Sequence, residues 1–126
     1  LYTLDKYYNK TEDSVRLLLE SKELDVITIG TGKTIIDQYP VPNVATTKGS
    51  KVFLLTNSNL EDLIIPNFKG WSKKDVFTYL NLAKIKYKST GMGYLTNQSI
   101  VNEKINPGDI LEIEFEEKYV TEEKEE

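Results

Sequence analysis

The sequence contains no cysteine and no histidine. It therefore cannot form a Cys/His or Ser/His/Asp nucleophile system, a zinc site of the usual ligands or a disulfide framework. Its 16 basic and 20 acidic residues give a net charge of −4, which provides no electrostatic reason to expect nucleic acid or anionic lipid as a partner. No apolar run approaches the ~20 residues of a membrane-spanning helix, and the N-terminus has no signal-peptide pattern. We therefore expect no membrane contact by these residues, and any anchor must lie outside them.

A repeat of about 60 residues is the main feature that is present. Helical spacing occurs at Val15, Leu18 and Leu19, and again, 61 residues later, from Val76 through Tyr79 and Leu80 to Ala83. Thr11 and Ser72 precede these runs and are typical N-cap residues. The two segments predict one helix in each half of the chain.

Glycine turns and β-prone runs follow each predicted helix with the same spacing. Gly30-Thr31-Gly32 and Gly91-Met92-Gly93 come after short runs at 26–29 and 87–90. Gly49 and Gly108 precede alternating runs, of which the second places Ile110, Glu112 and Glu114 on the face opposite Leu111 and Ile113. The sequence thus predicts an α+β fold of two tandem units, each with one helix packed on a three-stranded β-sheet.

The predicted boundaries are 1–57 for the first unit, 58–116 for the second and 117–126 for an acidic tail. The tail has two basic and five acidic residues, and this composition predicts disorder. The linker between the units is apolar at Leu60, Leu63, Ile64 and Ile65, too apolar for a free tether. We therefore expect it to pack, either between the units or into the core of the second.

Two motifs resemble a known family. Asp37-Gln38-Tyr39-Pro40, followed by a strand after Gly49, resembles the end of a PASTA repeat, and Gly70-Trp71-Ser72 before the second helix resembles the opening of the next one. The second half of the chain has the same pattern in Asn97-Gln98-Ser99, followed by Asn106-Pro107-Gly108. The chain resembles tandem PASTA repeats from the C-terminus of a class B penicillin-binding protein of a Gram-positive coccus. In the second copy, Ile100 stands where the Gln-x-Pro motif has its proline. This difference predicts a differently built turn there.

The resemblance implies a location and partners. It implies a non-catalytic accessory module of a cell-division penicillin-binding protein that supports septal peptidoglycan synthesis on the extracellular face of the membrane, anchored through an upstream segment. Its expected partners are its own transpeptidase domain, peptidoglycan or muropeptides, and division proteins. The alternative is the muropeptide-sensing extracellular stalk of a bacterial PASTA Ser/Thr kinase.

The sequence lacks the motifs of the transpeptidase reaction itself. No Ser is followed three residues later by Lys, no Ser-x-Asn occurs, and Lys88-Ser89-Thr90-Gly91 is one residue too long for Lys-Thr-Gly. The two Gly-x-Gly pairs lack the further Gly or Gly-Lys-Ser/Thr of a phosphate loop, and we interpret them as tight turns. We expect no catalytic residue, metal or cofactor in this chain, and a D,D-transpeptidase elsewhere in the parent protein.

Five residues are candidates for contact with wall fragments. Aromatic rings can stack on sugars and lysines can meet carboxylates, which points to Trp71, Tyr94, Tyr39, Lys86 and Lys88. Each also has a structural interpretation. Trp71 precedes a helix cap and can pack there, the tyrosines can fill a small core, and the lysines alternate with Ile85 and Tyr87 on an exposed strand face. The single Arg in the sequence, Arg16, argues against an elaborate carboxylate-binding groove.

Overall fold

The computed structural model describes residues 1–117, and all but Glu117 of the predicted acidic tail lies outside them. The chain divides into two compact units, unit 1 at residues 1–60 and unit 2 from residue 61 onward. Both have the element order that the repeat predicts, and the α+β fold class is confirmed. Among residues 1–117, no helix is long and apolar enough to cross a membrane.

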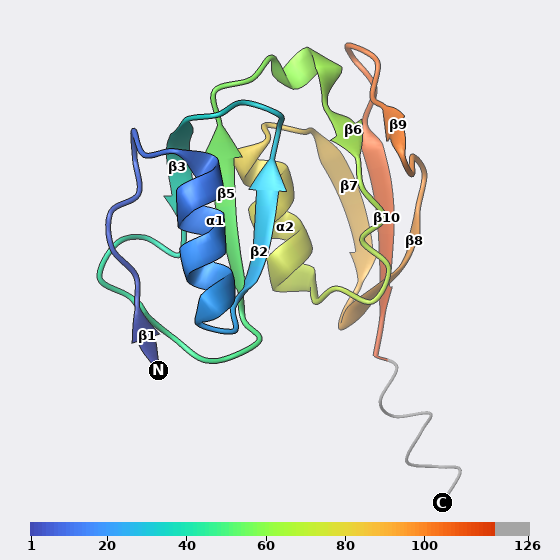
Figure 1. Cartoon of the computed structure of the whole chain (residues 1–126). Helices are drawn as coiled ribbons and strands as arrows, with labels where there is room; N and C mark the ends of the chain where they lie inside the picture. Colours follow the sequence, from blue (N-terminus) through green and yellow to red (C-terminus); the bar gives the residue numbers. More distant parts are fainter. Residues whose placement is uncertain (118–126) are drawn as a thin grey trace, which may run out of the picture. The chain divides into compact units, whose positions relative to one another are not determined.

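Unit 1 has one helix lying along one face of a three-stranded sheet (Figure 1). In the sheet the last strand, β5 (Lys51–Thr56), is central and lies parallel to β2 (Asp25–Ile29) and antiparallel to β3 (Ile35–Tyr39). A short ribbon, β1 paired with β4, completes the unit. The elements of unit 1 are β1 (Tyr2–Thr3), α1 (Glu12–Ser21), β2 (Asp25–Ile29), β3 (Ile35–Tyr39), β4 (Ala45–Thr46) and β5 (Lys51–Thr56).

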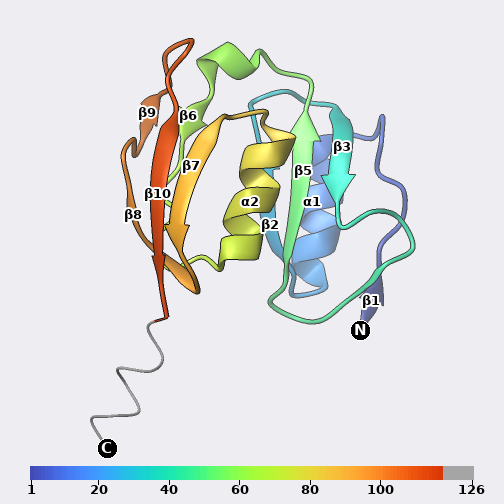
Figure 2. The ribbon, with the colours of Figure 1, turned by 180° about the vertical axis from the view of Figure 1, so that it is seen from behind.

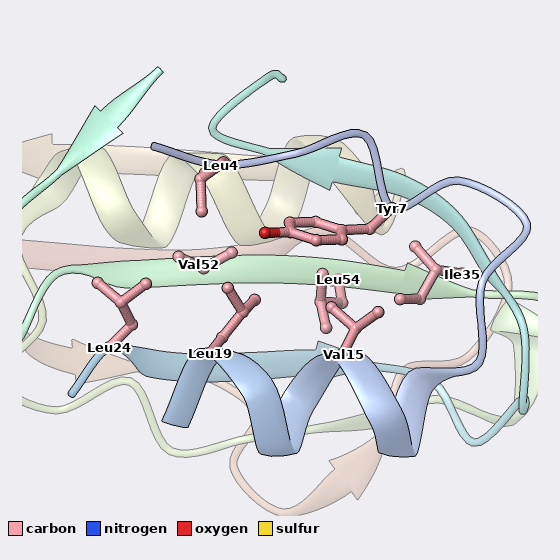
Figure 3. Packing of buried hydrophobic residues seen from close by; sticks show 8 residues of the cluster. All are labelled: Leu4, Tyr7, Val15, Leu19, Leu24, Ile35, Val52 and Leu54. Atoms are coloured by element: carbon pink, nitrogen blue, oxygen red, sulfur yellow. The ribbon is translucent and has the colours of Figure 1, made fainter. Parts of the chain in front are cut away.

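The core of unit 1 lies between α1 and β5. Val15 and Leu19 point from the helix toward Val52 and Leu54 on the strand (Figure 3). Leu18, which the helical spacing placed on the same face, is instead 40% exposed. The equivalent residue of unit 2, Tyr79, is 3% exposed beside the rings of Phe68 and Trp71, so the neighbouring side chains, and not the position on the helix, decide whether this residue is buried.

Unit 2 repeats the same topology (Figure 2). Its central strand, β10 (Leu111–Glu116), lies parallel to β7 (Tyr87–Gly91) and antiparallel to β8 (Tyr94–Gln98). All four apolar positions of the predicted second helix are buried. The elements from the linker onward are a 3₁₀ turn (Leu60–Asp62), β6 (Ile64–Ile65), α2 (Lys73–Leu82), β7 (Tyr87–Gly91), β8 (Tyr94–Gln98), β9 (Glu103–Lys104) and β10 (Leu111–Glu116).

The second half of the linker belongs to unit 2. Ile65 is fully buried, Leu63 is 9% exposed, and β6 pairs antiparallel with β9. The expectation that the apolar linker packs is therefore met in part, because Leu63 and Ile65 join the core of the second unit whereas Ile64 is 49% exposed. The ribbons β1–β4 and β6–β9 were not predicted, because two-residue strands carry no periodic signal.

A buried glutamine ties the N-terminal segment of each unit to its sheet. In unit 1 the Gln38 side-chain oxygen accepts from Tyr7 N (2.8 Å), and its nitrogen donates to Asp5 O (3.0 Å) and Pro40 O (3.1 Å). This amide thereby provides a partner for the buried N–H of Tyr7 and for two partly buried carbonyls.

Gln98 makes the same three bonds in unit 2, with Phe68 N (2.8 Å), Pro66 O (2.9 Å) and Ile100 O (2.8 Å). The differently built turn expected at Ile100 is therefore only partly found. The Tyr39–Pro40 peptide bond is cis, and it is the sole cis bond in residues 1–117, but the hydrogen bonds around the two glutamines are the same. The amide contacts backbone atoms alone, so it does not need the proline ring.

Candidate functional site

The outer face of the unit 2 sheet carries two of the five candidate binding residues, Lys88 and Tyr94. Successive side chains of a strand point to opposite faces, so the buried Leu111, Ile113 and Phe115 face α2 and the intervening residues face away from it. Phe77 of α2 lies 6.0 Å from Phe115, ring centre to ring centre, which fixes the inner side. We call the surface formed by Lys88, Thr90, Tyr94, Asn97, Glu112, Glu114 and Glu116 the outer face of unit 2.

Lys88 lies in the edge strand β7, directly opposite Glu112 of β10. Lys86, two residues earlier, comes just before the strand, and its carbonyl accepts from Leu111 N at 3.0 Å. Both lysine side chains are exposed, as the alternation with Ile85 and Tyr87 predicts. Neither forms an ion pair within residues 1–117 that holds it in one position.

Tyr94 lies on the same outer face at the other end of the sheet. It opens β8, pairs with Glu116 and is 39% exposed. Lys88 and Tyr94 lie on opposite sides of β10 and are therefore about 13 Å apart along the strands and about 10 Å apart across the sheet. A ligand contacting both would have to extend across the carboxylate of Glu114.

Trp71 packs inside unit 2 as part of an aromatic cluster. Its ring centre is 5.0 Å from that of Phe68 and 6.2 Å from that of Tyr79, both in edge-to-face geometry. Its backbone holds the start of β8, because Leu95 N donates to Trp71 O (2.9 Å). The half-buried ring thus has the packing role that its place before the helix cap suggested.

Tyr39 belongs to unit 1, at the end of β3 opposite Phe53, and is 36% exposed. It is therefore not part of the outer face of unit 2. Of the five candidate residues, Lys88 and Tyr94 lie in the sheet of unit 2 and Lys86 lies just before its strand β7. Trp71 packs against Phe68 and against Tyr79 of α2.

Carboxylates dominate the middle of the outer face. Glu112, Glu114 and Glu116 are exposed at successive outward positions of the central strand, with Lys88 beside the first. The alternation was visible in the sequence, but nothing there indicated that β7 would be the neighbour of β10. An acidic wall peptide approaching Lys88 would also meet Glu112 and Glu114, whereas a surface carrying both signs of charge could pair with all of them.

The described residues offer no arrangement typical of catalysis or metal binding. Within residues 1–117, no cluster of three or more Asp or Glu residues could hold a metal ion, and every buried side-chain nitrogen or oxygen has a hydrogen-bond partner. Arg16, whose hydrogen bond to Glu12 raises its pKa, serves a structural ion pair on α1.

The glycine pairs are tight turns, as interpreted from the sequence. Gly91 and Gly93 have φ of 81° and 99°, and a Cβ on Gly93 would lie 2.5 Å from Glu116 O. Such a substitution would clash with the backbone of β10, so only glycine fits there. The pair therefore allows a close approach of two strands and does not form a phosphate cradle.

Comparison with protein families gives a match to the PASTA domain over residues 2–58. No curated protein matches the chain. Among solved structures, penicillin binding protein 2X from Streptococcus thermophilus matches 90% of this chain with a TM-score of 0.76 and 22% identity. This chain covers 17% of that protein.

Two solved structures of Ser/Thr kinases from Staphylococcus aureus also match 90% of this chain. The extracellular region of the kinase PrkC gives a TM-score of 0.36 at 15% identity, and a three-PASTA-domain structure gives 0.35 at 17%. The chain covers 46% and 66% of these structures. It thus spans less than two thirds of each of the three.

Proposed function

Because residues 2–58 are a PASTA domain and unit 2 repeats its fold, we propose that the chain is a non-catalytic accessory module of a cell-division penicillin-binding protein. In this role it supports septal peptidoglycan synthesis by a transpeptidase domain elsewhere in the parent protein. It works on the extracellular side of the membrane and is anchored through another segment of that protein.

The observation that carries this proposal is the two-unit fold. Both units together match a segment of a penicillin binding protein with a TM-score of 0.76. The opening Gly70-Trp71-Ser72 of unit 2 adds support, because Ser72 caps the start of α2 and Trp71 packs against Phe68 there.

The outer face of unit 2 is the proposed contact surface, and the parent's transpeptidase domain is its proposed partner. The mixed charges of Lys88 and Glu112, Glu114 and Glu116 suit a protein surface with charges of both signs better than the carboxylates of wall peptides. Contact with peptidoglycan or with division proteins is secondary in this proposal.

The test is a titration of the isotope-labelled chain with the purified transpeptidase domain and, separately, with soluble muropeptides, followed by two-dimensional amide NMR. We expect the transpeptidase domain to shift the amides of β7 and β10. The charge reversal Lys88→Glu should weaken this binding by about three- to tenfold, as for charges at the rim of an interface. The matched control is Lys33→Glu, an exposed lysine of unit 1.

Two results would contradict the proposal. One is the absence of shifts with the transpeptidase domain at about 1 mM, where even weak specific binding is visible. The other is equal weakening by Lys88→Glu and Lys33→Glu. Saturable shifts with muropeptides alone would instead favour the extracellular stalk of a PASTA kinase.

A further inference from the structure

Unit 2 contains the one sulfur atom of the sequence, which has no cysteine and a single methionine, Met92. Met92 lies between Gly91 and Gly93 in the tight turn that joins β7 to β8, and its side chain is 61% exposed. Peroxides convert an accessible thioether to a sulfoxide. Oxidation of this sequence at sulfur is therefore directed to one exposed position.

Lys73, the first residue of α2, brings a cation to this sulfur. Its Nζ lies 3.6 Å from Met92 Sδ and donates to Gly91 O at 2.9 Å. The backbone N of Lys73 donates to Gly93 O at 3.0 Å. The turn between β7 and β8 is therefore tied to the start of α2 on both sides of Met92, at the end of unit 2 where α2 begins (Figure 2).

Two aromatic rings hold the ammonium group of Lys73 in this place. Its Nζ lies 5.4 Å from the ring centre of Phe77 and 5.6 Å from that of Phe115. Within residues 1–117 no carboxylate forms an ion pair with it. A thioether sulfur is only a weak hydrogen-bond acceptor. The ammonium is thus positioned beside Met92 and would gain from a stronger acceptor there.

Oxidation by hydrogen peroxide supplies such an acceptor. The sulfur lone pair attacks one peroxide oxygen, so that an S–O bond forms as the O–O bond breaks. The transferred hydroxyl gives its proton to the departing hydroxide, which leaves as water. The sulfur is oxidised by two electrons and the peroxide is reduced. The sulfoxide oxygen is a polar acceptor, and its hydrogen bond with an ammonium group is charge-assisted.

We propose that Met92 is an oxidation site and that Lys73 binds the oxygen of its sulfoxide, which tightens the junction between the β7–β8 turn and α2. The sulfur, the cation and the turn that carries them all belong to unit 2. The inference does not rest on the function proposed above, because neither Met92 nor Lys73 belongs to the outer face of unit 2.

The fold does not require this pair of residues. The 61-residue shift places Thr31 at the position of Met92 and Glu12 at the position of Lys73. Glu12 carries the opposite charge and accepts from Arg16 at 2.9 Å. Unit 1 therefore builds the same turn and the same helix start without a sulfur or a cation, so the presence of both in unit 2 needs another reason.

The experiment treats the 126-residue chain with hydrogen peroxide and follows it by mass spectrometry and amide NMR. We expect one added oxygen atom, located on Met92 and formed about as fast as the sulfoxide of N-acetylmethionine amide, because the side chain is exposed. Hydrogen exchange of the Lys73 backbone N–H should then slow by about three- to tenfold, as for one added hydrogen bond.

Substitutions at Lys73 test the role of the cation. Lys73→Gln should abolish the slowing, whereas Lys73→Arg keeps a cation and should retain it. Lys74→Gln is the matched control, because it removes the charge of the adjacent, exposed lysine of α2. Each variant is compared before and after oxidation, so that a direct effect of the substitution on exchange cancels. Met92→Leu reports any effect of peroxide elsewhere in the chain.

Three outcomes would overturn the proposal. The first is a Met92 that stays reduced while N-acetylmethionine amide is oxidised in the same solution. The second is unchanged or faster exchange of the Lys73 N–H after oxidation of the native chain. The third is equal slowing in the native chain and in Lys73→Gln, which would show that the ammonium group does not bind the sulfoxide.

Discussion

At the scale of single residues, some equivalent positions of the two units carry the same residue with the same hydrogen bonds. Others carry different residues with different partners. Gln38 and Gln98 make the same three hydrogen bonds. In contrast, Glu12 of α1 accepts from Arg16 (2.9 Å) and Thr28 (2.7 Å), whereas Lys73, at the position of Glu12, donates to Gly91 O (2.9 Å). The buried amide is retained because its partners are backbone atoms, which every sequence of this fold supplies.

Replacing Gln98 by Leu should destabilise unit 2 strongly. The buried Phe68 N–H and two carbonyls would lose their partners, and we expect the free energy of unfolding to fall by about 2–4 kcal/mol. The measurement is urea denaturation followed through the amide signals of unit 2. The neighbouring, exposed Asn97→Ala is the control and should change stability by no more than about 0.5 kcal/mol. Similar losses in both variants would contradict the role assigned to the amide.

Burial raises the pKa of Tyr79 from 10.0 to about 12. Between these values the unfolded chain releases the phenol proton and the folded chain keeps it, so the unfolded state binds fewer protons. The free energy of unfolding of unit 2 should therefore be unaffected by this group below pH 10 and should fall as the pH rises toward 12.

The measurement compares urea denaturation of the native chain and Tyr79→Phe from pH 9 to 12. The variant keeps the ring that packs against Phe68 (5.0 Å) and removes the titrating group. Lysines titrate in both proteins, so the difference between the two curves isolates Tyr79. Parallel curves over this range would show that Tyr79 does not contribute.

At the scale of elements, the two helices occupy the same place but start differently. Ser72 Oγ accepts from Asp75 N at 3.2 Å, which caps α2. Thr11 has extended backbone geometry at the start of α1, but its side chain makes no capping bond. Both residues were predicted as N-caps from the sequence, and both hold that position, yet the hydrogen bond forms at only one.

Removal of the two hydroxyls should therefore have unequal effects. Ser72→Ala should lower the stability of unit 2 by about 1 kcal/mol, the usual cost of losing an N-cap. Thr11→Ala should cost unit 1 clearly less, because no capping bond is lost. Denaturation monitored separately through amides of α1 and α2 gives both values. A larger loss for Thr11→Ala would contradict the assignment.

At the scale of the whole molecule, each unit contains the groups that complete its own core. Phe68 and Ile65, which precede α2, are fully buried, and Gln98 ties their segment to β8. Asn57 at the end of unit 1 accepts from Thr34 N at 3.1 Å. A division near residue 60 therefore leaves both sets of contacts intact, whereas one just before α2 does not.

Fragments 1–60 and 61–117 should each fold, although about 60 residues is near the lower limit for an independent domain. Fragment 70–117 should not, because it lacks β6 and Phe68. Amide NMR spectra of the three fragments provide the measurement, with dispersed signals indicating a folded core. Dispersed signals from 70–117 would contradict the structural role of the linker.

The sequence predicted which charged residues of the candidate site are exposed. It did not predict which of these charges lie beside one another. The exposed placement of Lys86 and Lys88 and the outward direction of Glu112 and Glu114 follow from alternation along single strands. That Lys88 lies beside Glu112 depends on which strands pair and in which register.

The sequence by itself determined the two repeats, their α+β class and the positions of helices, turns and main strands. These features are local, since a helix repeats every 3.6 residues, a strand every two, and glycine marks positive φ. Tertiary structure alone decided that β5 and β10 are central, that Leu18 is exposed and that Gln38 and Gln98 hold the N-terminal segments. These outcomes depend on contacts between residues far apart in the chain, and no local pattern specifies which distant partner each residue meets.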